Sequence, residues 1–395
     1  MTPSEEELAA FRLRIRDVIA TKAPGAGERE GHRAPTSAEQ ERSLRSWYAT
    51  MYDEGLAGAG WPTEWGGNAE HHPLHEVIVN EELIRARAPR PLDQVNLAAG
   101  LLLRFGTAEQ QARYLPRIRS GDDVWCQLFS EPGAGSDLAG VTTRAEPQRD
   151  GTFILRGQKT WTTDGHWAQM GVALARTSTE ERRHAGLSVF VVPMDAPGIE
   201  VRPLRTIGGA WDFNETFLDD VVVGPDAVLG VLGHGWSVVM AGLETERFGV
   251  AGNVALLRLL LEDLLEVADE LELDGHRALG LADVQQAIAD LAARAEAARA
   301  FTDGHVLSAM AGHEIEGDAS IAKILHTETY QAISSYAEHL IGSGDLSATA
   351  LGARAAAGRL RDAWLWSRAL TISGGSSEIM RNILAKRRLR LPTTR

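Results

Sequence analysis

The sequence predicts an α+β protein with a helical first part, a strand-rich middle and a helical last part. Apolar residues recur at three- and four-residue spacing up to about residue 121, and helical spacing returns from about residue 233. Between them, short β-branched and aromatic runs alternate with turn residues. At 395 residues the chain is too long for one simple core. We therefore expect three domains, at residues 1–122, 123–234 and 235–395.

The first domain is expected to be built of helices. Apolar residues follow the helical period in the segments Leu8–Ile19 and His75–Ile84. Ser4 followed by Glu7 is typical of a capping box, and Thr107 marks the start of a later helix. These signals predict an N-terminal helical domain that ends near residue 122.

The middle domain is expected to be a β-barrel or a sandwich-like β structure. Gly, Pro and Asp punctuate its strand-like runs. The runs are Val124–Phe129, Thr152–Leu155, Gly171–Ala175, Leu187–Val192 and Glu215–Asp219. Because no GxGxxG opens a βαβ unit, the sequence disfavours a Rossmann dinucleotide fold.

The last domain is expected to be a four-helix bundle. Four segments combine regular apolar spacing with residues that favour helices. They are Leu256–Leu271, Val284–Met310, Ala319–Ile341 and Ala355–Leu370.

Composition excludes several classes of protein. A net charge of −14 without a long basic run disfavours nucleic acid as a partner. The single cysteine, Cys126, rules out an internal disulfide framework and is expected to be a buried, inert thiol. No apolar signal core or run of membrane-spanning length is present, so we expect a cytoplasmic protein without a membrane partner. The histidines lack metal-ligand spacing, and no metal site is predicted.

A glycine-rich segment, CQLFSEPGAGSDLAG at residues 126–140, is the first candidate for a ligand site. Gly133 and Gly135 allow the backbone to turn tightly and to bring its N–H groups close to a ligand. Ser130 and Ser136 add hydroxyl groups on either side of this turn. The alternative for such a segment is an ordinary glycine-rich turn after a strand.

Two further motifs decide between these interpretations: GQKTWTT at residues 157–163 and ISGGSSEIMRN at residues 372–382. In this order and at this spacing, the three motifs closely resemble those of the acyl-CoA dehydrogenase flavoprotein family. The resemblance covers nearly the whole chain. It implies the acyl-CoA dehydrogenase fold, FAD as cofactor and an oxidoreductase that acts on CH–CH groups of acyl-CoA thioesters in lipid metabolism.

The resemblance also implies which residues contact FAD. Ser130 would hydrogen-bond the pyrimidine side of the isoalloxazine ring, Trp161 would stack near the ring, and Ser136 would meet the pyrophosphate. Ser376 and Glu378 match positions that approach the adenosine half from a neighbouring subunit. The cofactor-binding residues implied in full are Phe129, Ser130, Gly135, Ser136, Trp161, Thr163, Arg277, Ser376 and Glu378.

The family reaction requires a carboxylate that removes the α-proton of the acyl group while a hydride leaves the β-carbon. Many members carry this base at the position of Gly374, which has no side chain here. Isovaleryl- and long-chain-type members place it just before an arginine early in the C-terminal domain, where this chain has Glu246 and Arg247. We therefore expect Glu246 as the base, Gly374 as a backbone donor to the thioester oxygen, and Glu244 and Arg247 as substrate-binding residues.

Other positions depart from the family pattern. The Arg-x-x-Phe-Gly element that reaches the FAD of the partner subunit is replaced by GHRALG at residues 275–280, where Arg277 is the partial substitute. Similar divergence occurs in members that act on bulky or polycyclic acyl-CoAs, some of them two-subunit assemblies.

The expected partners are an acyl-CoA, an electron-transfer flavoprotein or another acceptor, and further subunits in a homodimer, a homotetramer or a heterotetramer. The alternatives are a non-catalytic partner subunit and a flavin monooxygenase or oxidase on the same fold.

Overall fold

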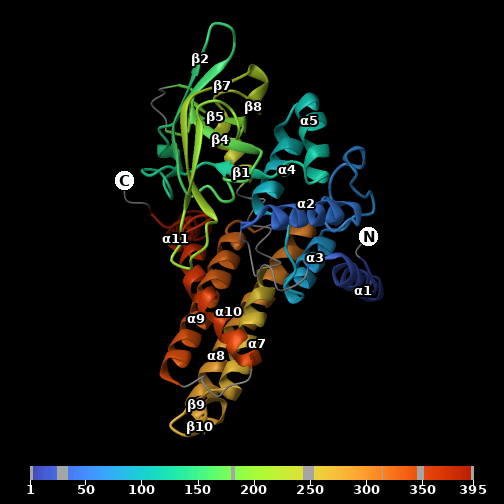
Figure 1. Ribbon diagram of the computed structural model, residues 1–395, viewed down its shortest axis with the longest axis vertical. Helices are drawn as coiled ribbons and strands as arrows, with labels where there is room; N and C mark the ends of the chain where they lie inside the picture. Colours follow the sequence, from blue (N-terminus) through green and yellow to red (C-terminus); the bar gives the residue numbers. More distant parts are fainter. Residues whose placement is uncertain are drawn as a thin grey trace. The chain divides into compact units, whose positions relative to one another are not determined.

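The structure is a computed structural model (Figure 1) that describes residues 3–24, 34–178, 183–242, 253–313, 315–344 and 351–392. The chain divides into two compact units. One unit takes in residues 1–79 and 87–246, and the other takes in residues 80–86 and 247–395. The three domains expected from the sequence, with boundaries at 122 and 234, stay a prediction.

The first unit begins with helices. They are α1 (Glu5–Lys22), α2 (Ala38–Asp53), η1 (Thr63–Trp65), α3 (Pro73–Arg85), α4 (Asp93–Phe105) and α5 (Ala108–Arg119), of which residues 80–85 of α3 belong to the other unit. The capping box of Ser4 and Glu7 opens α1 as predicted, and Thr107 with Gln110 forms a second capping box before α5. Helices α2 and α4 lie in the region expected to be helical but were not predicted as separate elements.

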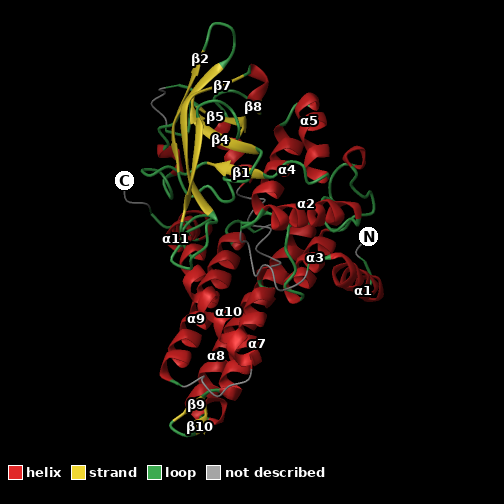
Figure 2. Cartoon of the chain, viewed as in Figure 1, coloured by secondary structure: helices red, strands yellow, loops and turns green. Residues whose placement is uncertain are grey.

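A mixed sheet follows in the same unit (Figure 2). Its strands are β1 (Trp125–Leu128), β2 (Arg144–Pro147), β3 (Phe153–Lys159), β4 (Met170–Arg176), β5 (Leu187–Pro193), β6 (Ile199–Leu204), β7 (Phe213–Val223) and β8 (Val228–Leu229). The order is β6-β7-β3-β2-β4-β5-β8, and β1 pairs with β4 in parallel.

Strands β4 and β5 form the buried centre of this sheet. Their sequences, MGVALAR and LSVFVVP, are almost continuously apolar because both faces are covered. Cys126 lies in the same core and is 1% exposed, and burial, with a smaller contribution from the charge of Asp164, raises the pKa of its thiol. The prediction of a buried cysteine is confirmed.

The second unit is a bundle of long helices that lie side by side in Figure 1. Its described elements are α7 (Ala255–Glu270), β9 (Glu272–Leu273), β10 (His276–Arg277), η4 (Ala278–Gly280), α8 (Ala282–Met310), α9 (Asp318–Ser343), α10 (Leu351–Leu370), α11 (Ser377–Ile383) and the π-helical turn η5 (Leu384–Arg388). The helices α7, α8, α9 and α10 share one apolar core. An N-terminal helical region, a central sheet and a C-terminal helical bundle confirm the predicted fold class.

One charged pair lies inside this bundle. Asp263 on α7 is 3% exposed, and its carboxylate accepts hydrogen bonds from Nε and Nη2 of Arg359 on α10, with a shortest distance of 2.5 Å. The pair therefore ties α7 to α10 at a buried position. In the described part of the chain, no helix combines the length and apolar character needed to cross a bilayer.

Candidate functional site

The first two sequence motifs come together in the first unit. Strand β1 runs into Phe129 and Ser130, and β3 ends at Lys159, two residues before Trp161. The backbone N–H of Thr160 donates to the carbonyl oxygen of Ser130 at 2.9 Å. Two segments some thirty residues apart in sequence are thereby held next to each other.

Three hydroxyl groups at this junction are available to a ligand. Ser130 and Thr163 are half-buried, Ser136 is exposed, and among the described residues none forms a hydrogen bond with these side-chain oxygens. Gly133 and Gly135 are exposed, and a Cβ atom built at either would meet no atom of the chain within 4 Å. The fold itself does not require glycine there, so this open cradle fits an external group that approaches the backbone, such as the phosphates of FAD.

Trp161 adopts a backbone conformation that is unusual for a bulky residue. Its φ angle is 59°, in the left-handed region, and its side chain is 61% exposed with its ring 5.9 Å from that of Phe213. The next residue, Thr162, is fixed to β7 by two hydrogen bonds with Asn214, of 3.0 and 2.8 Å. This anchored turn presents the indole on the surface, where it can stack on a flat ring.

The side chain of Phe129 lies on the inner side of the same junction. It is 3% exposed and belongs to the core, while its carbonyl oxygen accepts a hydrogen bond from Lys159 at 3.0 Å. Phe129 therefore supports the end of β1 from within.

A buried ion pair joins the two motifs. Lys159 Nζ lies 2.9 Å from Glu131 Oε1, and the two residues are 0% and 5% exposed. Burial would raise the pKa of Glu131, but the Lys159 charge and hydrogen bonds from Thr143 and Thr142 outweigh it and lower the pKa to about 2. Burial lowers the pKa of Lys159 to about 8, against the opposing effect of Glu131. Both groups are charged at neutral pH.

This shift predicts a specific acid sensitivity. The unfolded chain protonates Glu131 near pH 4.5 and the folded chain only near pH 2, so the carboxylate stabilises the fold above pH 4.5 and loses this contribution as the pH falls to about 2. Glu131→Gln should therefore be less stable than the wild type at neutral pH, with the difference closing over that window in urea unfolding at several pH values. Glu200→Gln, at an exposed pair with Arg202, should follow the wild-type curve. A gap that stays constant with pH would contradict the assignment.

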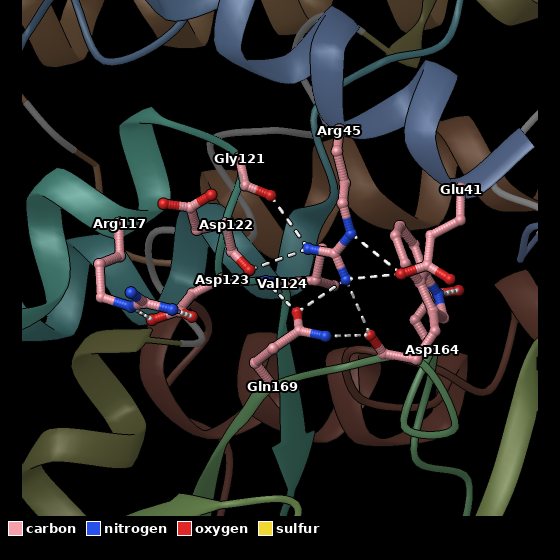
Figure 3. A network of polar contacts seen from close by, with 10 residues as sticks. Glu41, Arg45, Arg117, Gly121, Asp122, Asp123, Val124, Asp164 and Gln169 are labelled. Atoms are coloured by element: carbon pink, nitrogen blue, oxygen red, sulfur yellow. Dashed lines mark hydrogen bonds and ion pairs between the residues drawn. The ribbon is translucent and has the colours of Figure 1, made fainter. Parts of the chain in front are cut away.

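Figure 3 shows a second polar network, in which Arg45 of α2 points toward Gly121, Asp122 and Gln169. Its guanidinium donates to the carbonyl oxygens of Gly121 and Asp122 at 3.0 Å each, and to Gln169 Oε1 at 2.9 Å. Glu41 accepts from the same group at 2.9 Å. The network thus connects α2 with the entry to β1 and with the start of β4.

A hollow of about 670 Å³ lies elsewhere in the first unit. It is lined by Arg183, His184, His234 and Trp236, and the rings of His184 and Trp236 are 4.5 Å apart. Arg183 also pairs with Asp137, the residue after Ser136, at 2.6 Å. A cation, two imidazoles and an indole around an open hollow suit an anionic ligand with an aromatic part.

The third motif forms a turn and a short helix in the second unit. Gly374 and Gly375 have φ angles of 62° and 95°, a pair of left-handed residues that glycine adopts without cost. Lys323 of α9 donates to the carbonyl oxygen of Gly375 at 2.8 Å. The Ser376 side chain caps α11 through the N–H of Ile379.

Glu378, in the first turn of α11, is exposed, and hydrogen bonds from its own backbone N–H and from Ser376 lower the pKa of its carboxyl. The helix is held from α9 by a two-point ion pair between Arg381 and Glu328, at 2.7 and 2.8 Å. The whole motif is therefore fixed to α9.

Arg277 lies at the other end of the bundle. It sits in the β9–β10 hairpin and is paired with Asp269 at 3.5 Å. Lys323 of α9 holds the third motif, and α9 ends beside Leu271, so the twenty residues from Lys323 to Ser343 place the hairpin about 30 Å from that motif. The predicted residues Glu244, Glu246 and Arg247 lie outside the described residues.

Comparison with known proteins identifies the class. Models of the acyl-CoA dehydrogenase N-terminal, middle and C-terminal domains match residues 5–122, 126–221 and 233–389. The chain belongs to the acyl-CoA dehydrogenase family and is an oxidoreductase.

Several known proteins and solved structures are similar to this chain over nearly its full length. Acyl-CoA dehydrogenase IpdE1 of Mycobacterium tuberculosis is 37% identical over 407 residues, with 98% of each chain covered. The structure of the Tcur3481-Tcur3483 steroid ACAD is 28% identical, with a TM-score of 0.86 and 99% of each chain covered. The ChsE4-ChsE5 complex from M. tuberculosis is also 28% identical, with a TM-score of 0.83 and 100% coverage of both chains.

The residues that support these motifs were not predicted from the sequence. Lys159, Glu131 and Lys323 are buried, and each contacts backbone oxygens or N–H groups near a predicted site residue. A sequence signal existed for Lys159, because strand alternation puts it on the same face as Phe153 and Leu155. A charged residue at such a position calls for a buried partner.

Proposed function

We propose that this chain is an FAD-dependent acyl-CoA dehydrogenase that forms a double bond between the α- and β-carbons of an acyl thioester. The observation that supports this is the junction of the first two motifs, where Ser130, Ser136 and Thr163 offer hydroxyls beside the open cradle of Gly133 and Gly135. Bound FAD would accept the hydride that leaves the β-carbon. The indole of Trp161 would cover one part of the ring, and Thr163 would hydrogen-bond near its reacting edge.

Glu246 is proposed as the base that removes the α-proton. An α-proton of a thioester is weakly acidic, so its removal needs a positioned carboxylate and hydrogen bonds to the carbonyl oxygen. Gly374 can supply only its backbone N–H to that oxygen, since it has no side chain. Arg247 is proposed to fix the surroundings of the acyl group. The proton moves from the α-carbon to Glu246 as the β-hydride leaves, so charge balances across the two transfers.

The hollow lined by Arg183, His184, His234 and Trp236 is proposed to hold the nucleotide part of coenzyme A. Its cationic and aromatic side chains match phosphates and an adenine ring. Glu244 is proposed to contact the pantetheine arm. A thioester on pantetheine alone would lack the groups that this hollow recognises.

A bulky acyl group is proposed as the substrate. The support comes from the similar structure of a steroid acyl-CoA dehydrogenase, together with the departure from the family pattern near Arg277. An electron-transfer flavoprotein is the proposed acceptor, and the cytoplasm the proposed location.

An oligomer is proposed because Arg277 and Ser376 are separated by most of the length of α9, from Lys323 to Ser343, about 30 Å. That distance exceeds the size of one adenosine moiety. If both residues contact FAD, they contact cofactors at different sites, which requires further subunits. A heterotetramer with a homologous chain is the second candidate, supported by the similar structures of the pairs ChsE4-ChsE5 and Tcur3481-Tcur3483. In that assembly this chain could be the non-catalytic subunit.

Anaerobic reduction of the purified flavoprotein by a panel of thioesters tests the proposal. The panel contains straight-chain, branched and steroid-side-chain acyl-CoAs, and the acyl-pantetheine of the best substrate. We expect loss of the oxidised flavin absorbance with a bulky acyl-CoA and much weaker reduction by the pantetheine thioester. A colourless chain that takes up FAD only with a homologous partner would favour the second candidate. Fast reoxidation by oxygen with product bound would instead indicate an oxidase or monooxygenase.

A further inference from the structure

The proposed reaction does not use Lys159 and Glu131, although they are among the most deeply buried charged residues in the described part of the chain. Burying two charges costs free energy, and replacement of a buried ion pair by apolar residues is often neutral or stabilising. Stability alone is therefore a weak explanation for the presence of this pair. The hydrogen bonds of the two side chains indicate a different role.

The ammonium group of Lys159 ties three segments together. It donates to the carbonyl oxygen of Phe129 at 3.0 Å, to that of Leu174 on β4 at 2.7 Å, and to Glu131 Oε1 at 2.9 Å. All three N–H donors of the side chain are thus used. The Phe129 carbonyl directly precedes Ser130, and Lys159 itself is two residues before Trp161.

The carboxylate of Glu131 closes the glycine-rich loop at its neck. Its Oε2 accepts from the backbone N–H and the hydroxyl of Thr142 at 2.7 and 2.8 Å, and its Oε1 accepts from the N–H of Thr143 at 2.9 Å. Glu131 also exchanges backbone hydrogen bonds with Ala134, both of 3.0 Å. One side chain therefore holds both ends of the segment that contains Gly133, Gly135 and Ser136.

We propose that the Lys159–Glu131 pair is a positioning device that sets the two flavin-contacting segments, Ser130 with the glycine-rich loop and Trp161 with Thr163, in the arrangement that accepts FAD. The inference rests on the proposed function as a flavoprotein. It assigns a role to two residues that touch no reacting atom. They act through the backbone atoms that precede Ser130 and Trp161 and through the neck of the loop.

A double-mutant cycle separates positioning from simple stabilisation. The variants are Lys159→Met, Glu131→Gln and the combination of both, and the quantities are the thermal unfolding midpoint of the apoprotein, the dissociation constant of FAD and the absorption spectrum of bound flavin. Each single variant leaves one buried charge without its partner. We therefore expect a lower midpoint and at least about tenfold weaker FAD binding for both.

The double variant distinguishes a positioning role of the pair from a purely stabilising one. It buries no lone charge, so its unfolding midpoint should return towards that of the wild type. Its FAD affinity should stay at least about tenfold weaker and its flavin spectrum shifted, because the carbonyl oxygens of Phe129 and Leu174 have lost their common donor. Recovery of affinity and spectrum together with stability would overturn the inference, as would single variants with wild-type affinity and spectrum.

Two further variants keep the test usable if the single variants fold poorly. Thr142→Val, at an exposed position, removes one donor to Glu131 and should weaken FAD binding by about threefold. Arg202→Met, which breaks an exposed pair with Glu200 on β6, should leave affinity and spectrum unchanged. Unchanged FAD binding in Thr142→Val would contradict the inference. The FAD dissociation constant and the flavin spectrum are both measured without a substrate. The result is therefore independent of whether the proposed dehydrogenation is correct.

Discussion

Glu246→Gln is expected to abolish reduction of the flavin by substrate, with a loss in rate on the order of 10³-fold. Glutamine keeps the size and hydrogen-bonding shape of the side chain but cannot take up the α-proton. Gly374 has no side chain to replace it. The measurement is anaerobic stopped-flow reduction by the best acyl-CoA, with FAD content determined on the same sample.

The matched control is Glu262→Gln, at an exposed glutamate that pairs with Arg258 on α7. It makes the same chemical change and should reduce at the wild-type rate. If Glu246→Gln retains FAD and is reduced as fast as the wild type, Glu246 is not the base. Loss of FAD from Glu246→Gln would point to a structural role instead.

Arg359→Met is expected to destabilise the helical bundle by about 3–5 kcal/mol. The change leaves the carboxylate of Asp263, which is 3% exposed, without the guanidinium that holds it at 2.5 Å. A buried carboxylate that loses a charged partner keeps its desolvation cost with less compensation. Chemical unfolding followed by far-UV circular dichroism measures the effect, with the two structural units fitted as separate transitions.

Arg361→Met on the same helix is the control. Arg361 is paired with Glu338 at 3.1 Å, but its side chain is 56% exposed, so the loss should stay below about 1 kcal/mol. Equal effects of the two variants would show that burial of Asp263 does not decide the stability of the bundle.

Helices and strands with a strong apolar period were predicted accurately from the sequence. The helix expected at residues 256–271 is found at Ala255–Glu270, and the strand expected at 187–192 is found at Leu187–Pro193. Strand β6 was missed because half of its residues are exposed and its pattern is weak. Helix α2 was also missed, although Leu44, Trp47, Tyr48 and Met51 follow the helical period within a polar sequence.

The candidate site could be predicted only in part. Motifs report local sequence, whereas the residues that hold these motifs in place do so through tertiary contacts. Ser130 and Trp161 stand in motifs that can be recognised along the chain. The contacts of Lys159 with Phe129 and Leu174, and of Lys323 with Gly375, join residues that are between fifteen and about fifty positions apart. Such pairs depend on the register of strands and on helix packing, which a single sequence does not determine.

The Arg45 network bears on how far the parts of this protein can be exchanged (Figure 3). The guanidinium is shared between the carbonyl oxygens where the chain enters β1 and the side chain of Gln169. In a chimera whose first 122 residues came from a relative without an arginine at this position, Gln169 and those carbonyls would lose their common donor. The N-terminal segment is thus not a freely interchangeable module, since grafting it would require matched residues on both sides of the seam.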